Sequence, residues 1–179
     1  MKKIIIISGS NRSKSNARRV SDYVQKKYTT QGIQAEVFDL KDYPFEDTID
    51  GSYDSKKPKI KAFNEYLLGA DGIVFVVPEY NGSFPGFLKV MIDYTPYPNG
   101  FENKPIAYIG EASGVFGSLR AVEQFQLVMN YRNALSYPVR VFIQRVSKNF
   151  SDEDGPTDPF ISKLLDEQIT GFSKFVNAF

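Results

Sequence analysis

Three short segments of this chain consist almost entirely of large apolar residues, and each has the length of one β-strand. They are residues 4–7, 73–77 and 106–109. A strand that is apolar at nearly every position is buried on both faces, which is typical of the central strands of a parallel sheet. Residues 33–39 and 138–144 alternate between apolar and polar positions instead. That alternation predicts edge strands with one wetter face.

Between the predicted strands, apolar residues recur every three or four positions, which predicts helices. Such patterns surround Val20, Leu67, Leu88 and Val122, and a last helix is expected near residues 160–179. The alternation of strands and helices predicts an α/β fold of three layers, with helices on both faces of a five-stranded parallel sheet. With the apolar strands central, the strand order is the flavodoxin-like order 2-1-3-4-5. A length of 179 residues suits one domain, so residues 1–179 are expected to form a single flavodoxin-like domain.

The chain contains neither cysteine nor histidine, and this excludes several kinds of site. Disulfides, thiolate or histidine metal sites and Ser-His-Asp triads are therefore ruled out, and no metal site is expected. If the chain is an enzyme, its reactive groups must come from a cofactor or from carboxylates, lysine or tyrosine. A net charge of +1 does not create the positive electrostatic potential that would attract nucleic acid. No stretch approaches the ~18–20 apolar residues of a membrane span, and the first apolar run is shorter than the roughly 7–15 residues of an export signal. We therefore expect a cytoplasmic protein with no nucleic-acid or membrane partner.

Small, hydroxylated and cationic residues follow the first strand directly, in the sequence SGSNRSKSN. Backbone N–H groups at the start of the next helix, together with Ser10, Arg12, Ser15 and Asn16, are suited to phosphate oxygens. Capping of the helix by Ser15 or Asn16 is a simpler explanation, but it accounts for neither Gly9 and Ser10 nor Arg12. The loop matches neither G-x-x-x-x-G-K-[ST] nor G-x-G-x-x-G. It therefore predicts a site for a terminal phosphate monoester that needs no Mg²⁺.

Two further loops are expected beside the first one, because the carboxyl ends of parallel strands meet at one edge of the sheet. Their candidate binding residues are Pro78, Glu79, Tyr80, Asn81 and Gly82 after the third strand, and Ser113, Gly114 and Gly117 after the fourth. The pair Asn81-Gly82 permits a tight turn, and the glycines of the third loop allow backbone to approach a flat ligand closely. Plain turns are the alternative interpretation, and the common position of the loops favours a binding site.

The segments GSNRSKSN, PEYNGSFPGFLKVMIDY and GEASGVFGSLRA resemble the flavodoxin-like NAD(P)H-dependent FMN reductases, a family that includes quinone, chromate and azo-dye reductases. The resemblance covers nearly the whole chain. It implies that Gly9, Ser10, Arg12 and Ser15 hold the FMN phosphate. It also implies that residues 78–82 line the isoalloxazine ring and that Ser113, Gly114 and Gly117 form a third wall.

Two positions differ from the pattern of that family. Many members carry an asparagine where this chain has Ala17, so Asn16 is a candidate substitute. Members often end the second motif with Asp-Trp, where this chain has Asp93-Tyr94. In the family the helix that contains this motif helps to form a dimer and often a tetramer, so the resemblance implies a homodimer or homotetramer.

The resemblance implies an FMN-dependent oxidoreductase that passes hydride from NADPH or NADH through bound flavin to a small acceptor, such as free flavin or a quinone. No side chain is expected to be catalytic, because the cofactor carries the chemistry. The alternative is a flavodoxin-like electron carrier or flavin-binding protein without turnover. Such carriers tend to be strongly acidic and have no cation in the phosphate loop, so the net charge of +1 and Arg12 favour the enzyme.

Overall fold

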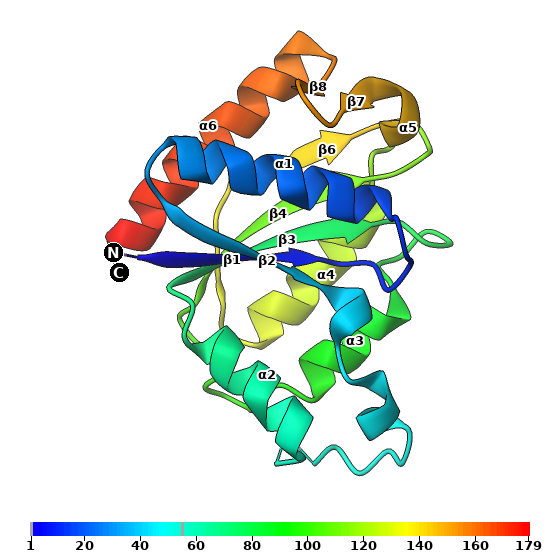
Figure 1. The fold of residues 1–179 in the computed structure, drawn as a ribbon, viewed down its shortest axis with the longest axis vertical. Coiled ribbons are helices and arrows are strands. Elements are labelled where there is room, and N and C mark those ends of the chain that lie inside the picture. The colour runs from blue at the N-terminus through cyan, green and yellow to red at the C-terminus, as the bar shows by residue number, and fades with distance from the viewer. Residues whose placement is uncertain (1, 55) are drawn as a thin grey trace.

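The computed structural model describes residues 2–54 and 56–179 and has a parallel sheet at its centre (Figure 1). The main strands are β1 (Lys3–Ser8), β2 (Gln34–Asp39), β3 (Gly72–Pro78) and β4 (Pro105–Glu111), and the fifth position is shared by β5 (Leu135–Ser136) and β6 (Val141–Ile143). The order is β2-β1-β3-β4-β5, and β6 also pairs with β4. All of these pairings are parallel, so the predicted order 2-1-3-4-5 is confirmed.

The fifth position differs from the single strand predicted over residues 138–144. Leu135 pairs with Pro105 at the start of β4, and Val141 pairs with Ile109 near its end. Between them lies Pro138, which has no N–H group and cannot donate to the ladder. The proline therefore divides this edge into two short strands.

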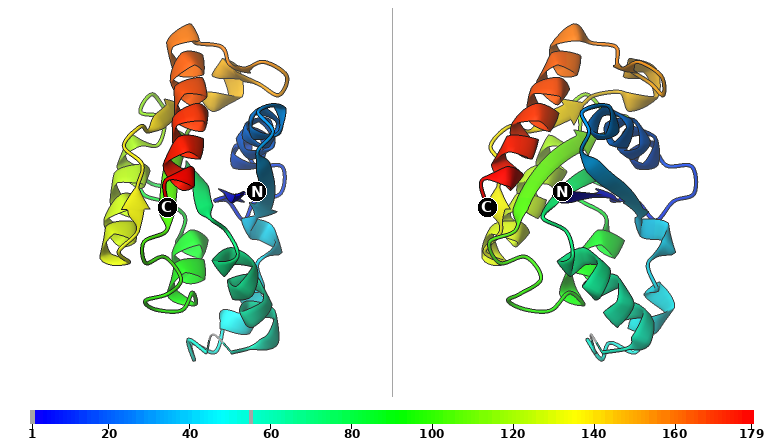
Figure 2. Two further views of the ribbon diagram at one scale, coloured as in Figure 1. Left: turned by 90° about the vertical axis from the view of Figure 1, so that its left-hand side faces the viewer. Right: turned by 60° about the vertical axis from the view of Figure 1, so that its left-hand side comes forward.

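The helices form two layers, one on each face of the sheet (Figures 1 and 2). Helices α1 (Asn16–Thr30) and α6 (Pro159–Asn177) cover one face, and α2 (Pro58–Leu68), α3 (Gly86–Asp93) and α4 (Leu119–Tyr131) cover the other. The shorter elements are η1 (Leu40–Asp42), η2 (Phe45–Thr48), α5 (Val146–Asn149) and the antiparallel pair β7 (Phe150–Ser151) and β8 (Gly155–Pro156). None of the helices within the described residues is both long and apolar enough to cross a membrane.

The apolar run in β1 is explained by these two layers. Ile4 and Ile6 belong to the core under α1 and α6, whereas Ile5 and Ile7 belong to the core over α2, α3 and α4. Successive side chains of a strand point to opposite faces, so a strand between two helical layers needs an apolar residue at every position. All four isoleucines are essentially inaccessible to solvent. This central strand fixes the position of the loop that follows it.

Candidate functional site

The loops that follow β1, β3 and β4 surround one cavity of about 270 Å³. Its lining residues are Arg12, Ser13, Lys14, Ser15, Asn16, Pro78, Glu79, Tyr80, Glu111, Ala112 and Ser113. All three predicted loops contribute to this set, which is the arrangement expected at the carboxyl ends of central parallel strands. Of the residues predicted from the sequence, seven lie in the lining: Arg12, Ser15, Asn16, Pro78, Glu79, Tyr80 and Ser113.

The first loop begins with a close approach to β3 at Gly9. The Gly9 N–H group donates to the Val76 carbonyl oxygen over 2.9 Å, and a Cβ atom at Gly9 would lie 2.6 Å from that oxygen. No larger residue fits there without moving the backbone. The next residue, Ser10, is fully buried, and its Oγ lies 2.6 Å from the Tyr80 hydroxyl oxygen and accepts from the Arg12 N–H group over 3.2 Å. Ser10 therefore lies beneath the cavity and connects the first loop to the second.

Helix α1 starts at the floor of this cavity. The Ser15 hydroxyl caps it by accepting from the Arg18 N–H group over 3.1 Å. The N–H groups of residues 13–16 donate to no atom of the described residues, so four backbone donors are left for a ligand. With the positive end of the helix dipole, they form an anion-binding site. The Arg12 guanidinium lies 5.8 Å from the centre of the Tyr80 ring and adds a positive charge at the same place.

The side chain of Asn16 is held by its neighbours in the chain. Its Oδ1 accepts from Arg19 Nη1 over 2.9 Å, and its Nδ2 lies 3.4 Å from Ser147 Oγ in α5. Asn16 lines the cavity, but its amide connects α1 to α5 in this structure.

The second loop is a tight turn that places Tyr80 in the cavity. Tyr80 and Ser83 exchange two backbone hydrogen bonds of 2.8 and 3.1 Å, and Asn81 and Gly82 between them have φ values of 53° and 79°. Positive φ at both central residues defines a type I′ turn. Gln124 of α4 fixes the turn through hydrogen bonds to the Gly82 carbonyl and the Ser83 hydroxyl. Asn81 and Gly82 lie at the tip of the turn and do not line the cavity.

The third loop contributes Ser113 to the cavity, while its Gly117 serves packing. The Gly114 carbonyl accepts from the Arg145 N–H group over 3.0 Å, and Gly117 has a φ of 57°. A Cβ atom at Gly117 would lie 3.0 Å from the backbone of Phe142. Neither glycine belongs to the lining. Gly117 allows the loop to turn and to pack against β6, whereas a Cβ atom at Gly114 would meet no atom within 4 Å.

A buried carboxyl group in the cavity, that of Glu111, was missed by the sequence analysis. Glu111 ends β4 and is only 5% exposed. Burial raises the pKa of Glu111 to about 7, and the Ala17 N–H group and the charges of Arg12 and Arg19 oppose this increase. A charged residue directly after an apolar strand is the same signal that identified the first loop, and it could have identified Glu111.

Glu79 is the second carboxyl group in the lining. Its Oε1 lies 3.7 Å from Arg120 Nη1, and its Oε2 is buried without a hydrogen-bond partner among the described residues. An unpaired buried oxygen of this kind is costly unless a ligand or water satisfies it. The free donors of the first loop and this free acceptor of the second both fit a polar ligand in the cavity.

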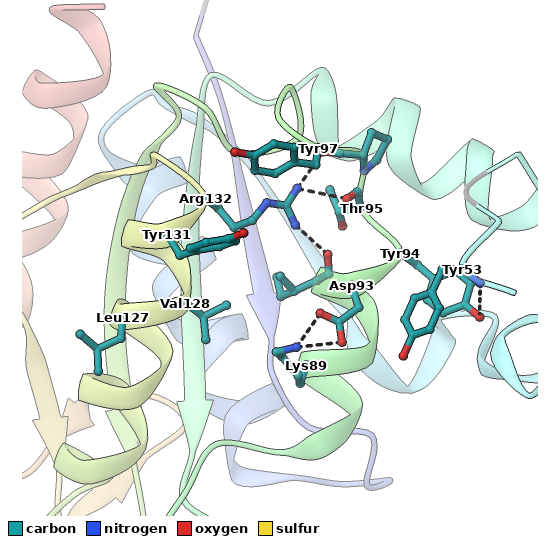
Figure 3. Close-up of a pocket in the computed structure, with 12 residues that line it drawn as sticks. Tyr53, Lys89, Asp93, Tyr94, Thr95, Tyr97, Leu127, Val128, Tyr131 and Arg132 are labelled. Atoms are coloured by element: carbon teal, nitrogen blue, oxygen red, sulfur yellow. Dashed lines mark hydrogen bonds and ion pairs between the residues drawn. The ribbon is translucent and has the colours of Figure 1, made fainter. Parts of the chain in front are cut away.

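A larger cavity of about 550 Å³ lies away from these loops, between the C-terminal ends of α3 and α4 (Figure 3). The Arg132 side chain lies along it and donates to the carbonyl oxygens of Ile92, Thr95 and Pro96 over 2.9, 3.1 and 2.7 Å. These bonds hold the segment after α3 in place, and Tyr97 and Tyr131 give the cavity aromatic walls. It lies at the C-terminal ends of two helices, which carry the negative end of the helix dipole, so the smaller cavity is the candidate for an anionic ligand.

The sequence of this chain matches a known protein family. Residues 2–147 match the model of the family described as NADPH-dependent FMN reductase. The chain is 33% identical over 123 residues to an FMN-dependent NADPH-azoreductase of Staphylococcus aureus, a match that covers 66% of this chain and 64% of the relative. The matched region thus spans less than two thirds of that relative.

Solved structures show the same fold. The flavoenzyme NAD(P)H:acceptor oxidoreductase FerB from Paracoccus denitrificans has a TM-score of 0.80 at 21% identity, covering 99% of this chain and 98% of that one. The apo form of the NADH:FMN oxidoreductase EMOB has a TM-score of 0.77 at 19% identity, with coverages of 98% and 90%. An archaeal flavodoxin is also similar, with a TM-score of 0.65 at 12% identity and 99% coverage of both chains. From the family match over most of its length, this chain belongs to the NADPH-dependent FMN reductase family.

Proposed function

We propose that this chain is an FMN-dependent oxidoreductase that passes hydride from NADPH or NADH through bound FMN to a small acceptor, such as a quinone, free flavin or an azo compound. The observation that carries the proposal is the cavity where the three loops meet. Unpaired backbone N–H groups that can bind an anion lie at one side of it, and the Tyr80 ring lies at the other. When bound, FMN supplies the redox chemistry, and the protein supplies binding, orientation and electrostatics. One such domain spans residues 1–179 in this proposal.

The ester phosphate is assigned to the N–H groups of residues 13–16 at the start of α1. Arg12 and the hydroxyl of Ser15 complete this set, because both line the cavity beside those groups. A phosphate monoester carries about −1.5 to −2 charges at pH 7 and three acceptor oxygens, which matches a set rich in donors. Ser10 acts indirectly in this proposal, since its hydroxyl holds Tyr80.

The flat part of the cofactor is assigned to the walls formed by Pro78, Tyr80 and Ser113. Tyr80 presents a ring whose hydroxyl is fixed to Ser10, and the type I′ turn after it is fixed to α4. Neither loop therefore has to order itself when a ligand binds, and this reduces the entropic cost of binding. Asn81, Gly82, Gly114 and Gly117 shape these walls from behind.

The rival function is an electron carrier or flavin-binding protein without turnover. The net charge of +1 and Arg12 at the phosphate site favour the enzyme. The two functions are separated by steady-state oxidation of NADPH by the FMN-loaded protein, with and without a quinone. Turnover that depends on the quinone is expected for the enzyme. A loaded protein that exchanges electrons but does not consume NADPH would favour the carrier.

We also propose that two copies, or four, assemble through the surface beside α3 and α4. Large apolar side chains gather there: Tyr53, Tyr97, Leu127 and Tyr131 line the cavity of Figure 3 and are each more than 60% exposed. Exposed apolar patches of this kind often mark protein interfaces. Tyr94, where relatives often have tryptophan, is buried and donates to the Thr48 carbonyl oxygen, so it supports this surface from beneath.

Light scattering after gel filtration tests the assembly. We also propose a cytoplasmic location, which cell fractionation tests.

A further inference from the structure

The carboxyl group of Glu111 and the proposed phosphate site share one small cavity. Glu111 is the last residue of β4, where it pairs with Pro78 of β3 and Ile143 of β6. The Ala17 N–H group in the first turn of α1 lies near enough to this carboxyl group to lower its pKa. The free N–H groups of residues 13–16 lie in the same loop, one residue earlier. An ester phosphate at those groups would therefore lie beside a buried carboxyl group.

Two anions at one helix start repel each other, and a carboxyl group under such conditions binds a proton more tightly. The charged groups around Glu111 and its cavity are Arg12 and Lys14 in the first loop, Arg19 in α1, Glu79 in the second loop, Arg120 in α4 and Arg145 beside the third loop. Arg19 is already paired with Asp152 over 2.7 Å, and Glu79 adds negative charge. Arg12, Lys14, Arg145 and Arg120, which lies 3.7 Å from Glu79, carry four positive charges. Two carboxylates and a phosphate dianion carry four negative charges, so no positive charge is in excess to keep all of these acids ionised.

We infer that FMN binding takes up one proton from solvent, which is then held between the Glu111 carboxyl group and an oxygen of the ester phosphate. In this arrangement the protonated partner donates a hydrogen bond to the other one, so the two groups attract rather than repel. The inference rests on the proposed function, because it needs the ester phosphate at the start of α1. It assigns to Glu111 the role of a positioning residue that recognises a phosphate monoester.

The inference makes FMN affinity depend on pH in a defined range. Without ligand, burial holds the pKa of Glu111 at about 7, and the second pKa of a phosphate monoester is about 6. Above about pH 7.5 both free partners are mostly ionised, so binding has to take up close to one proton. The dissociation constant of FMN should then rise by about tenfold for each pH unit between pH 7.5 and 8.5.

Calorimetric titration of the full-length apoprotein with FMN measures this proton directly. The titration is performed at pH 8 in two phosphate-free buffers that differ in their enthalpy of ionisation, and the difference in heat gives the number of protons taken up. We expect close to one proton for the wild type and close to none for Glu111→Gln. The matched control is Glu123→Gln, because Glu123 is an exposed carboxyl group on α4, 3.9 Å from Arg140, and should leave the value at one.

Each outcome decides the matter. FMN that binds without proton uptake, or uptake that persists in Glu111→Gln, overturns the inference and leaves the proposed function intact. If Glu111→Gln does not fold, uptake that survives Glu79→Gln assigns the proton to Glu111, and uptake that is lost in it refutes that assignment. A chain that binds no FMN at any pH contradicts the proposed function itself, and the inference with it.

Discussion

The substitution Glu111→Gln should stabilise the ligand-free protein at neutral and alkaline pH. Glu111 is buried at the end of β4, and its carboxylate is disfavoured there by the loss of hydration. Glutamine has nearly the same shape and stays neutral at every pH. The benefit of the substitution should therefore appear only where the wild-type carboxyl group is ionised.

The size of the effect follows from the pKa of Glu111 in the two states. The group has a pKa of 4.5 when unfolded and about 7 when folded, so the folded state binds the proton more tightly. The stabilising contribution of this proton is fully present below pH 4.5 and is lost as pH rises to 7. The difference of about 2.5 pH units, at ~1.4 kcal/mol for each, amounts to ~3.5 kcal/mol. Relative to wild type, the free energy of unfolding of Glu111→Gln should rise by about this much between pH 4.5 and pH 8.

Urea unfolding of the apoprotein, followed by far-ultraviolet circular dichroism, measures this difference; the chain contains no tryptophan. Wild type, Glu111→Gln and the surface control Glu123→Gln are compared at pH 4.5, 6 and 8 in phosphate-free buffer. The control should follow the wild type within ~0.5 kcal/mol at each pH, because exposed ion pairs contribute little. If the curves of wild type and Glu111→Gln stay parallel from pH 4.5 to 8, the carboxyl group is not held in the neutral form by burial, and the reasoning fails.

Three further substitutions test the proposed cofactor site. Arg12→Ala should weaken FMN binding by ~1.5–3 kcal/mol through the loss of a charge-assisted hydrogen bond, and unchanged affinity in a fluorescence titration would remove Arg12 from the site. Gly9→Ala should destabilise the protein by ~1–3 kcal/mol and impair FMN binding, because its Cβ atom would lie 2.6 Å from the Val76 carbonyl oxygen. Its control is Gly86→Ala, where no atom lies within 4 Å, and equal urea midpoints for the two variants would contradict the close approach. Tyr80→Phe removes the hydroxyl that joins the first two loops and should cost ~0.5–1.5 kcal/mol of unfolding free energy, with weaker FMN binding; identical behaviour to wild type would show that this bond positions nothing.

The strand order could be predicted from the sequence because burial on two faces leaves a direct signal. The isoleucines at positions 4–7 are apolar at every position, and only a strand between two helical layers requires that. The edge was harder to predict, because an edge strand can be interrupted without exposing the core. Pro138 provides that interruption, and attention to its missing N–H group would have corrected the boundaries.

The candidate site was predicted in outline, and its details depended on tertiary packing. The sequence placed three loops at one edge, and the structure brings them around one cavity. The sequence could not distinguish residues that line the cavity from residues that only shape the loops. Asn81 and Gly117, for example, are small turn-forming residues that would be expected in both places. The place of Glu111 directly after an apolar strand could be read from the sequence, but its burial depends on tertiary packing, which no local pattern reports.

The central claim is that the cavity between the three loops binds FMN and that NADPH reduces it there. The most direct measurement is the visible absorption spectrum of the purified chain after reconstitution with FMN and removal of free flavin, recorded before and after anaerobic addition of NADPH. We predict about one bound FMN per chain and bleaching of its absorption by NADPH. A chain that retains no FMN, or retains FMN that NADPH leaves oxidised, would contradict the account.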